Sequence, residues 1–224
     1  MQPYFFPYIG YFQLIHSVDK FILYDDVQYT KRGWINRNIL SSKSGEWKFT
    51  IACSSSPEET LISGITIAPE YNRNKFISRV KQEFSILGDF NYDGFELVKQ
   101  IISNEESNLF RYIHSSLLIS SEYLGIHRDK FIISSKVGDF TKLKGSTKVL
   151  AICKEMNAST YINPISGAHL YEKSFFESKG IQLEFLKPVV KVLSEKESPV
   201  SILQYLITQK KSRISAQLTS GIIQ

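Results

Sequence analysis

The sequence predicts an α/β protein with a mostly parallel, doubly wound (Rossmann-like) sheet that is flanked by helices. Short apolar runs, which are typical of buried strands, alternate along the chain with segments whose apolar residues recur at the helical period. This alternation indicates strand–helix–strand units, and such units build parallel sheets. A length of 224 residues is that of one ordinary α/β domain. We therefore expect one domain over residues 1–209, followed by a polar tail over residues 210–224.

The first part of the chain begins with a loop that is framed by prolines. Apolar residues at helical spacing then predict a helix over residues 11–18, and the apolar run at 21–24 predicts a buried strand. Alternating residues on both sides of a Ser/Gly-rich turn at 41–45 predict a small β-hairpin insertion over residues 38–52. Residues 62–67 alternate apolar with polar or small side chains, which indicates a further strand.

A helical subregion is expected over about residues 74–125. The apolar spacing from residue 74 predicts a helix that stops near Gly88, and amphipathic helices follow over residues 95–102 and 109–124.

Strands and helices alternate again in the last part of the chain. Short apolar runs predict strands at residues 130–135, 160–162 and 181–186. Helical spacing predicts helices at residues 147–156, 171–179 and 199–208. Because the chain after residue 209 is mostly polar, we expect that end to be frayed.

The charge of the chain suits a phosphate-bearing partner. The formal net charge is +5, but the cations are scattered, with no run longer than the pair Lys210-Lys211. An RNA- or DNA-binding arm would concentrate them. A nucleic-acid partner is therefore not expected, unless a charged tRNA is the donor of a transferred group.

Cysteine and histidine usage predicts no metal site. Cys53 and Cys153 lie far apart in the sequence, which indicates reduced, partly buried thiols of a cytoplasmic protein. The four histidines show neither HxH nor HExxH spacing. The cofactor is unknown, since the sequence carries neither a coenzyme A signature nor a P-loop. No apolar run approaches the length of a transmembrane helix and no signal peptide is visible, so no membrane insertion is expected.

The densest group of polar and aromatic residues is YDDVQYTKRGWINRN, at residues 24–38. It directly follows the strand predicted at 21–24, and open α/β sheets place ligands beyond the carboxyl ends of their strands. Exposed aromatic residues beside Arg are typical of recognition surfaces. The alternative is a surface loop with solvated charges.

Three polar and aromatic loops are expected to line one cleft. The loops at residues 2–13, 25–38 and 163–171 each follow a predicted strand, although the strand expected ahead of Gln2 is missing or reduced to a residue or two. In a parallel sheet such loops emerge at the same edge.

Three motifs together resemble the WbqC-like family of bacterial proteins: QPYFFPYIGYFQLI at residues 2–15, YDDVQYTKRGWINRN at 24–38 and YINPISGAHLY at 161–171. The likeness runs nearly end to end. Relatives usually have an apolar strand before the Gln-Pro pair. WbqC-like proteins are associated with gene clusters for O-antigens and other surface polysaccharides of the lipopolysaccharide type. These clusters often make amino sugars that carry amino acids or acyl groups.

The resemblance thus implies a transferase that joins an acyl or amino-acyl group to the amine of a nucleotide-linked (dTDP-type) amino sugar. The alternatives are a non-catalytic nucleotide-sugar-binding module and an ATP-dependent amide ligase. The ligase reading rests on a weaker likeness, because Tyr8-Ile9-Gly10-Tyr11 stands where nucleotidyltransferase-like folds carry His-x-Gly-His.

In this setting several residues are candidates for catalysis. Asp25 or Asp26 would be the general base, Asn36 or Asn38 the oxyanion donor, and His169 an acid/base group. The alternatives are an aspartate ion pair that fixes the loop and a histidine that is merely exposed.

The candidates for ligand binding fall into four groups. Three cations would meet a pyrophosphate, namely Lys31, Arg32 and Arg37. Three aromatic residues would stack on the base or the sugar, namely Tyr8, Tyr11 and Trp34. Polar side chains from the three loops would bind hydroxyls and amides, namely Gln2, Gln13, Gln28, Asn163 and Ser166. Two glycines would allow close approach of the ligand, namely Gly10 and Gly167.

Overall fold

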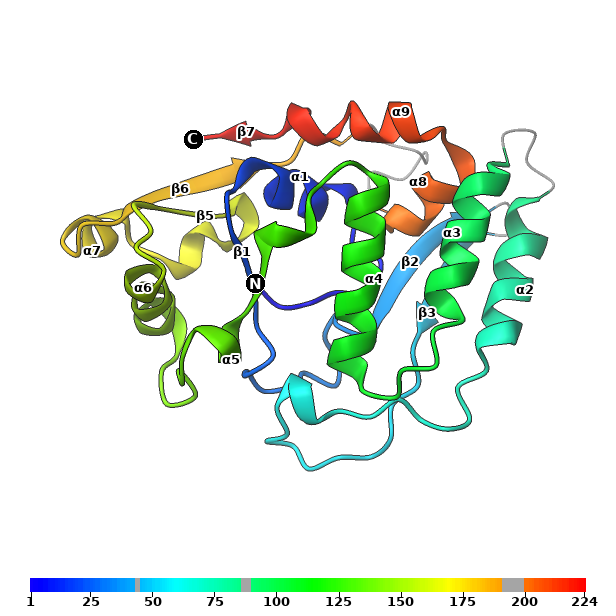
Figure 1. Cartoon of the computed structure of the whole chain (residues 1–224), viewed down its shortest axis with the longest axis horizontal. Coiled ribbons are helices and arrows are strands. Elements are labelled where there is room, and N and C mark those ends of the chain that lie inside the picture. Colours follow the sequence, from blue (N-terminus) through cyan, green and yellow to red (C-terminus); the bar gives the residue numbers. More distant parts are fainter. Residues whose placement is uncertain (43–44, 86–89, 191–199) are drawn as a thin grey trace.

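Helices and strands alternate along most of the chain in the computed structural model, which describes residues 1–42, 45–85, 90–190 and 200–224 (Figure 1). The α/β class predicted from the sequence is confirmed. None of the described helices is long and apolar enough to cross a membrane.

The first sheet pairs two strands that are far apart in sequence. Strand β1 (Phe21–Leu23) runs parallel to β4 (Phe131–Ile133), with Phe21 opposite Phe131 and Leu23 opposite Ile133. Helix α1 (Ile9–Ser17) leads into β1, and its first seven residues are buried. The sequence segment from 9 to 24 therefore forms the helix and strand that its apolar spacing predicts.

The second sheet lies at one end of the molecule, with β5, β6 and helices α6 and α7 (Figure 1). Strand β5 (Thr160–Pro164) runs parallel to β6 (Gln182–Lys187), and β7 (Ile222–Ile223) adds to β6 in the antiparallel direction. Helices α6 (Gly145–Glu155) and α7 (Lys173–Glu177) contribute to a small core with β6, built from Val149, Leu150, Cys153, Phe176, Ile181, Leu183 and Phe185.

The hairpin and the helical subregion form the opposite end of the molecule (Figure 1). Strands β2 (Arg37–Ser42) and β3 (Gly45–Thr50) are antiparallel. They lie near three helices, α2 (Arg73–Phe84), α3 (Tyr92–Ile102) and α4 (Leu109–Tyr123). Helix α8 (Ile202–Thr208) packs against α3 so closely that a Cβ atom at Gly94 would lie 1.8 Å from the Leu206 carbonyl oxygen.

Short elements connect these parts: η1 (Ile62–Gly64), η2 (Arg128–Lys130), α5 (Ser134–Val137), η3 (Ile165–Leu170), α9 (Lys211–Ser215) and η4 (Leu218–Ser220).

The predicted single doubly wound sheet is not formed by the described residues. They hold three separate sheets, of two, two and three strands. The two parallel pairs, β1 with β4 and β5 with β6, are not hydrogen-bonded to each other. A cavity lies between β1 and β5.

Two local predictions were also wrong. Residues 62–67 do not form a strand: Ile62–Gly64 form the 3-10 turn η1, in which Ile62 donates its main-chain N–H to the Val27 carbonyl at 2.9 Å, and Thr66 and Ile67 make isolated bridges to Asn108 and Cys53. The end of the chain is not frayed: Ile214 and Leu218 are buried, and β7 pairs with β6. The predicted turn at residues 43–44 and the predicted helix stop at Gly88 lie outside the described residues.

Candidate functional site

Asp25 joins the carboxyl ends of β1 and β4. Its Oδ1 accepts the main-chain N–H of Ser135 at 3.1 Å, and its Oδ2 accepts the Ser135 hydroxyl at 2.7 Å. The carboxylate is buried, with 7% exposure. Because both oxygens are engaged, Asp25 fixes the start of α5 to the end of β1.

Asp26, the next residue, forms a buried ion pair with Lys148 of α6. Lys148 Nζ lies 2.8 Å from Asp26 Oδ2, with side-chain exposures of 5% and 6%, and it also donates to the Asp26 main-chain carbonyl at 3.2 Å. The other carboxylate oxygen, Oδ1, accepts no hydrogen bond from a described residue. Asp26 is therefore held in place through Oδ2, while Oδ1 is left with acceptor capacity.

Lys148 was missed in the sequence, although a signal for it exists. It stands beside Val149 and four residues before Ile152, on the side of the helix that the apolar residues occupy. A lysine on the buried face of a helix needs a partner, because an unpaired buried ammonium is costly. The sequence cannot show which of the carboxylates in the chain supplies it.

Tyrosine side chains lie near this pair. Lys148 Nζ lies 5.1 Å from the centre of the Tyr24 ring. Burial, with smaller contributions from the neighbouring Tyr171 and Cys153, raises the pKa of Tyr24. The rings of Tyr161 and Tyr171 meet edge to face at 5.8 Å. These contacts join the end of β1 to the loop that follows β5.

Cys153 of α6 is buried near these rings. Burial raises the pKa of its thiol to about 11, so the group is protonated near neutral pH. A thiol in this state is a poor nucleophile.

The loop after β5 places Asn163 on the same side. Tyr161 donates its hydroxyl to Asn163 Oδ1 at 3.2 Å. Gly167 lies against this amide, because a Cβ atom there would be 2.5 Å from Asn163 Nδ2. Ser166 and His169 are exposed. Asn163 and Tyr24 line one cavity, so the ends of β1 and β5 lie at the same edge.

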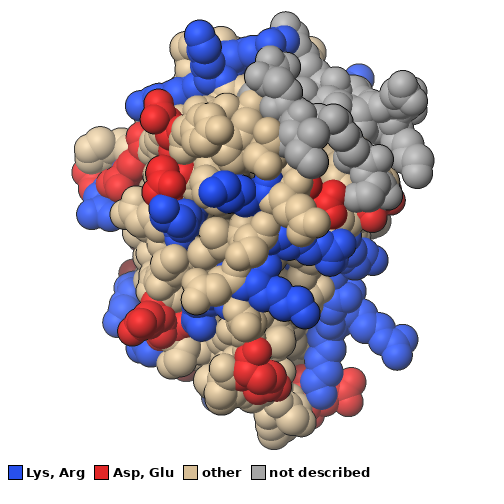
Figure 2. Space-filling view, turned by 90° about the vertical axis from the view of Figure 1, so that its right-hand side faces the viewer, with Lys and Arg blue, Asp and Glu red and all other residues tan. Residues whose placement is uncertain are grey.

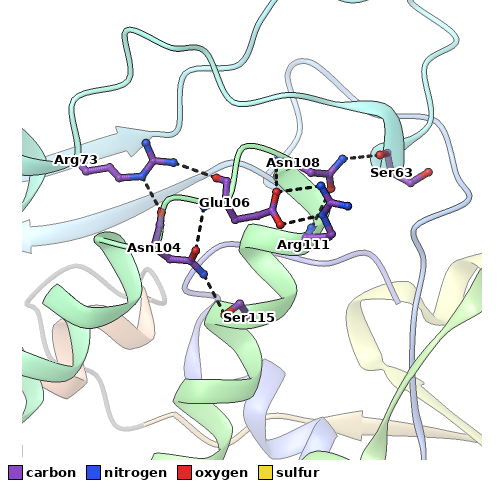
Figure 3. A network of polar contacts seen from close by, with 7 residues as sticks. All are labelled: Ser63, Arg73, Asn104, Glu106, Asn108, Arg111 and Ser115. Carbon is purple, nitrogen blue, oxygen red and sulfur yellow. Dashed lines mark hydrogen bonds and ion pairs between the residues drawn. The ribbon is translucent and has the colours of Figure 1, made fainter.

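A polar network at the start of α4 holds the loop after β1 (Figure 3). Ser63 donates its main-chain N–H to the Asp25 carbonyl at 3.0 Å, and the Ser63 carbonyl accepts Asn108 Nδ2 at 2.7 Å. Asn108 caps α4 by accepting the Arg111 N–H, and Arg111 forms an ion pair with Glu106 at 2.9 Å. The main chain at the candidate site is thus anchored to a long helix.

Two of the cations predicted to anchor a pyrophosphate, Lys31 and Arg32, lie in the loop between β1 and β2. Lys31 and Arg32 are exposed. Trp34 is 50% exposed, and Lys48 Nζ lies 5.8 Å from the centre of its ring. Figure 2 shows the side of the molecule where α2 lies, with Lys and Arg side chains spread among other residues and carboxylates. This face holds several positive charges without forming one continuous basic patch.

Arg37, Asn36 and Asn38 contact main-chain groups near the hairpin. Arg37 donates to the Lys31 carbonyl. Asn36 Nδ2 donates to the Ile51 carbonyl at 2.8 Å, and Asn38 Nδ2 donates to the Phe6 carbonyl at 2.7 Å. The two asparagines hold the hairpin to neighbouring segments. Gln28 similarly donates to the Glu58 carbonyl at 3.0 Å.

The candidates of the first loop are mostly engaged inside the fold. Gln13 is fully buried, and its Nε2 donates to the carbonyls of Val189 and Gln217, both at 2.8 Å. Tyr11 is buried and donates its hydroxyl to the Gln2 carbonyl at 2.8 Å.

Tyr8 and Gly10 of the same loop lie in direct contact. Tyr8 is half-buried, and a Cβ atom at Gly10 would lie 2.3 Å from its ring. Gly10 therefore allows the Tyr8 side chain, rather than a ligand, to approach the helix.

The structure thus brings some predicted residues together and separates others. Asp25, Asp26 and Asn163 lie at one edge with Lys148. No hydrogen bond, ion pair or ring contact among the described residues joins this group to four of the other candidates, Lys31, Arg32, Trp34 and Arg37. Among the described residues, no group of three or more His, Cys, Asp or Glu side chains could hold a metal ion.

Comparisons with known proteins cover most of the chain. A model of the WbqC-like protein family matches residues 2–215. The uncharacterized protein Rv1507c of Mycobacterium tuberculosis (strain ATCC 25618 / H37Rv) is 28% identical over 194 residues, which cover 82% of this chain and 78% of that protein. No solved structure is significantly similar. The family match takes in Asp25, Asp26, Lys148 and Asn163.

Proposed function

The chain belongs to the WbqC-like protein family, and from this premise we propose that it is a transferase in O-antigen or surface-polysaccharide biosynthesis. It joins an acyl or amino-acyl group to the amine of a nucleotide-linked (dTDP-type) amino sugar. A cytoplasmic location belongs to the same proposal. The proposal includes a nucleic-acid partner only where a charged tRNA is the donor of the transferred group.

The observation that carries the proposal is the buried Asp26–Lys148 pair beyond the end of β1. Acyl transfer to an amine requires a group that takes a proton from nitrogen as the new C–N bond forms and the donor's leaving group departs. Lys148 Nζ lies 2.8 Å from Asp26 Oδ2, and Asp26 Oδ1 accepts no hydrogen bond from a described residue. Asp26 is therefore the base in this reaction.

Asp25 has a different role in the proposal. Ser135 occupies both of its oxygens, at 3.1 and 2.7 Å. Its part is to position the loop that carries Asp26. Because the two neighbouring aspartates have different roles, a substitution of Asp25 is a matched control for the same substitution of Asp26.

The sugar ring and the diphosphate are bound by other residues in this proposal. The aromatic group of Tyr24, Tyr161 and Tyr171 offers faces on which a sugar ring can stack. Lys31, Arg32 and Arg37 are the anchor for the diphosphate, which then extends toward the hairpin.

A non-catalytic nucleotide-sugar-binding module is the second candidate. One observation favours it: no hydrogen bond or ion pair among the described residues joins the predicted cations to the two carboxylates. Such a module needs cations and aromatic faces but no base.

A product-mass assay distinguishes the two. The protein is incubated with dTDP-linked amino sugars and a panel of acyl and amino-acyl donors, including charged tRNA. The proposal predicts a mass gain equal to the acyl group with one donor. Binding of the sugar nucleotide without a mass gain for any donor would support the binding module instead.

A further inference from the structure

The start of helix α6 leaves three main-chain N–H groups without a partner. The N–H groups of Gly145, Ser146 and Thr147 donate to no acceptor among the described residues. Lys144, which precedes the helix, gives no side-chain cap, and the first turn carries no acidic residue. The Thr147 hydroxyl donates to the Lys144 carbonyl at 2.7 Å. The N–H groups at this end of α6 are therefore free to bind an acceptor from outside the helix.

The start of α6 is also accessible. Gly145 and Thr147 are exposed, and a Cβ atom added to Gly145 would meet no heavy atom within 4 Å. Helices α5 and α6 are neighbours beside the loop that follows β1 (Figure 1). A ligand at the candidate site can therefore reach the start of α6 from solvent.

The buried carboxylate of Asp26 lies at this end of α6. Lys148 is the fourth residue of the helix, and helical side chains lean back toward the N-terminus. Its Nζ reaches Asp26 Oδ2 at 2.8 Å and the Asp26 carbonyl at 3.2 Å. Asp26 is 7% exposed, and its Oδ1 has no hydrogen-bond partner among the described residues. Because a buried acceptor without a donor is costly, Oδ1 indicates a ligand that brings an N–H or O–H group.

The charges around the start of α6 favour an anion. Lys142 and Lys144 are exposed cations in the turn before the helix. The Asp26 carboxylate does not offset them, because it is paired with Lys148. The helix dipole adds about half a positive charge at this end. Free N–H groups and positive charge at a helix start together bind phosphate groups.

Asp139 lies in the same turn but does not occupy the helix start. Its Oδ1 accepts the Thr141 N–H at 3.1 Å and the Thr141 hydroxyl at 2.7 Å. These hydrogen bonds, followed by the charges of Lys142 and Lys148, lower the pKa of Asp139. The carboxylate is therefore held within its own turn. The effect of Lys148 on it also places the Lys148 ammonium near the loop ahead of α6.

We propose that the start of α6 is a phosphate-binding site, and that it holds the phosphate next to the sugar in the substrate whose amine meets Asp26. The identity of this ligand rests on the function proposed above. The N–H groups of Ser146 and Thr147 bind the phosphate oxygens, and Asp26 Oδ1 accepts the amine. A nucleotide-linked amino sugar carries both groups on one ring. The second phosphate is left to the cations already assigned to the diphosphate.

The site has a defined part in the reaction. Binding the phosphate and the amine of one sugar ring at two fixed points sets the orientation of the amine toward its base. The N–H groups at the start of α6 are positioning groups in this scheme, because they do not touch the atoms that react.

The first test adds inorganic phosphate to the full chain and follows the main-chain amide signals by NMR. We expect saturable shifts at Gly145, Ser146 and Thr147. The Arg73 and Asn74 amides at the start of α2 are the control, because the Asn72 side chain caps that helix. Shifts of equal size at both helix starts, or no saturable shift at α6, would overturn the site.

Two variants then add the same charge to the second residue of two different helices. Ser146→Asp puts a carboxylate where the phosphate binds, and an acidic residue in the first turn stabilises a helix, so the fold is kept. It should weaken phosphate binding at least about tenfold. Asn74→Asp, at an exposed position of α2, should change it by less than about twofold. Phosphate binding by Ser146→Asp equal to that of the parent protein would overturn the proposal.

The second arm uses dTDP-glucose, which carries the sugar-linked diphosphate but no amine. It should shift the same three amides and compete with inorganic phosphate. A response to phosphate but not to dTDP-glucose overturns the assignment of the ligand. The function proposed above fails on a different result, the absence of a product of increased mass. A mass gain without any response at α6 would overturn this inference alone.

Discussion

Lys148 Nζ lies 2.8 Å from Asp26 Oδ2, and both side chains are more than nine-tenths buried. Removing one member of a buried pair leaves the other charge uncompensated. We therefore expect Lys148→Met to lower the free energy of unfolding by about 3–5 kcal/mol. Urea denaturation measures this change.

Two controls define the result. Lys144→Met, at an exposed position just before α6, should change stability by less than about 0.5 kcal/mol. The double variant Lys148→Met/Asp26→Leu should recover most of the loss, because it leaves no charge behind. A single variant as stable as the parent protein would show that the pair is not formed.

Asp25 and Ser135 give a second prediction. The Ser135 hydroxyl donates to Asp25 Oδ2 at 2.7 Å, and hydrogen bonds to charged groups are worth more than neutral ones. Ser135→Ala should destabilise the protein by about 1–2 kcal/mol. Ser166→Ala, at an exposed position, is the matched control in the same denaturation experiment. If the two variants lose the same free energy of unfolding, Asp25 does not fix the start of α5 to the end of β1.

The Glu106 carboxyl group should make the free energy of unfolding depend on pH in the acid range (Figure 3). The Asn108 N–H, followed by the Arg111 side chain, lowers the pKa of Glu106 from its ordinary value of 4.5. A carboxyl group with a lower pKa in the folded state stabilises that state above its unfolded pKa. This contribution is lost as the pH falls below about 4.5 and through the folded pKa.

Comparing Glu106→Gln with the parent protein between pH 3 and 7 tests this. The variant should be less stable at pH 7, and the difference should shrink toward pH 3. Glu105→Gln, at an exposed neighbouring position, is the control. A difference between variant and parent that stays constant with pH would refute the assignment.

Position 94 in α3 should not tolerate any residue larger than glycine. A Cβ atom there would lie 1.8 Å from the Leu206 carbonyl oxygen of α8, so the two helices would have to separate. Gly94→Ala should cost more than about 3 kcal/mol, although alanine is the better helix former. The exposed Gln100→Ala in the same helix should be nearly neutral in thermal unfolding. A stabilising effect of Gly94→Ala would show that the helices pack less closely.

Local patterns in the sequence predicted much of the fold. Helix α1, strand β1 and the β2–β3 hairpin form where their apolar spacing indicates, because each is specified by neighbouring residues. The strand predicted at residues 62–67 is absent. The main chain of Ile62 is hydrogen-bonded to Val27 instead, and the spacing of apolar residues cannot reveal such a contact.

The candidate site could be predicted only in part. The position of Asp25 and Asp26 after a strand is visible in the sequence. Their separate roles depend on Ser135 and Lys148, which are more than a hundred residues away. The predicted roles of Gln13 and Asn38 ignored the carbonyl groups that their amides bind in the folded chain. Such long-range partners cannot be read from spacing.

If Asp26 is the base of an acyl transfer to an amino sugar, its substitution should remove turnover and leave binding. Turnover of a dTDP-linked amino sugar by Asp26→Asn and Asp25→Asn, followed by product mass, tests this, with binding of the sugar nucleotide measured in parallel. We expect Asp26→Asn to lower turnover by at least about 100-fold while binding changes by no more than a few fold. We also expect Asp25→Asn to keep more of the activity. Turnover by Asp26→Asn equal to that of the parent protein would contradict the claim.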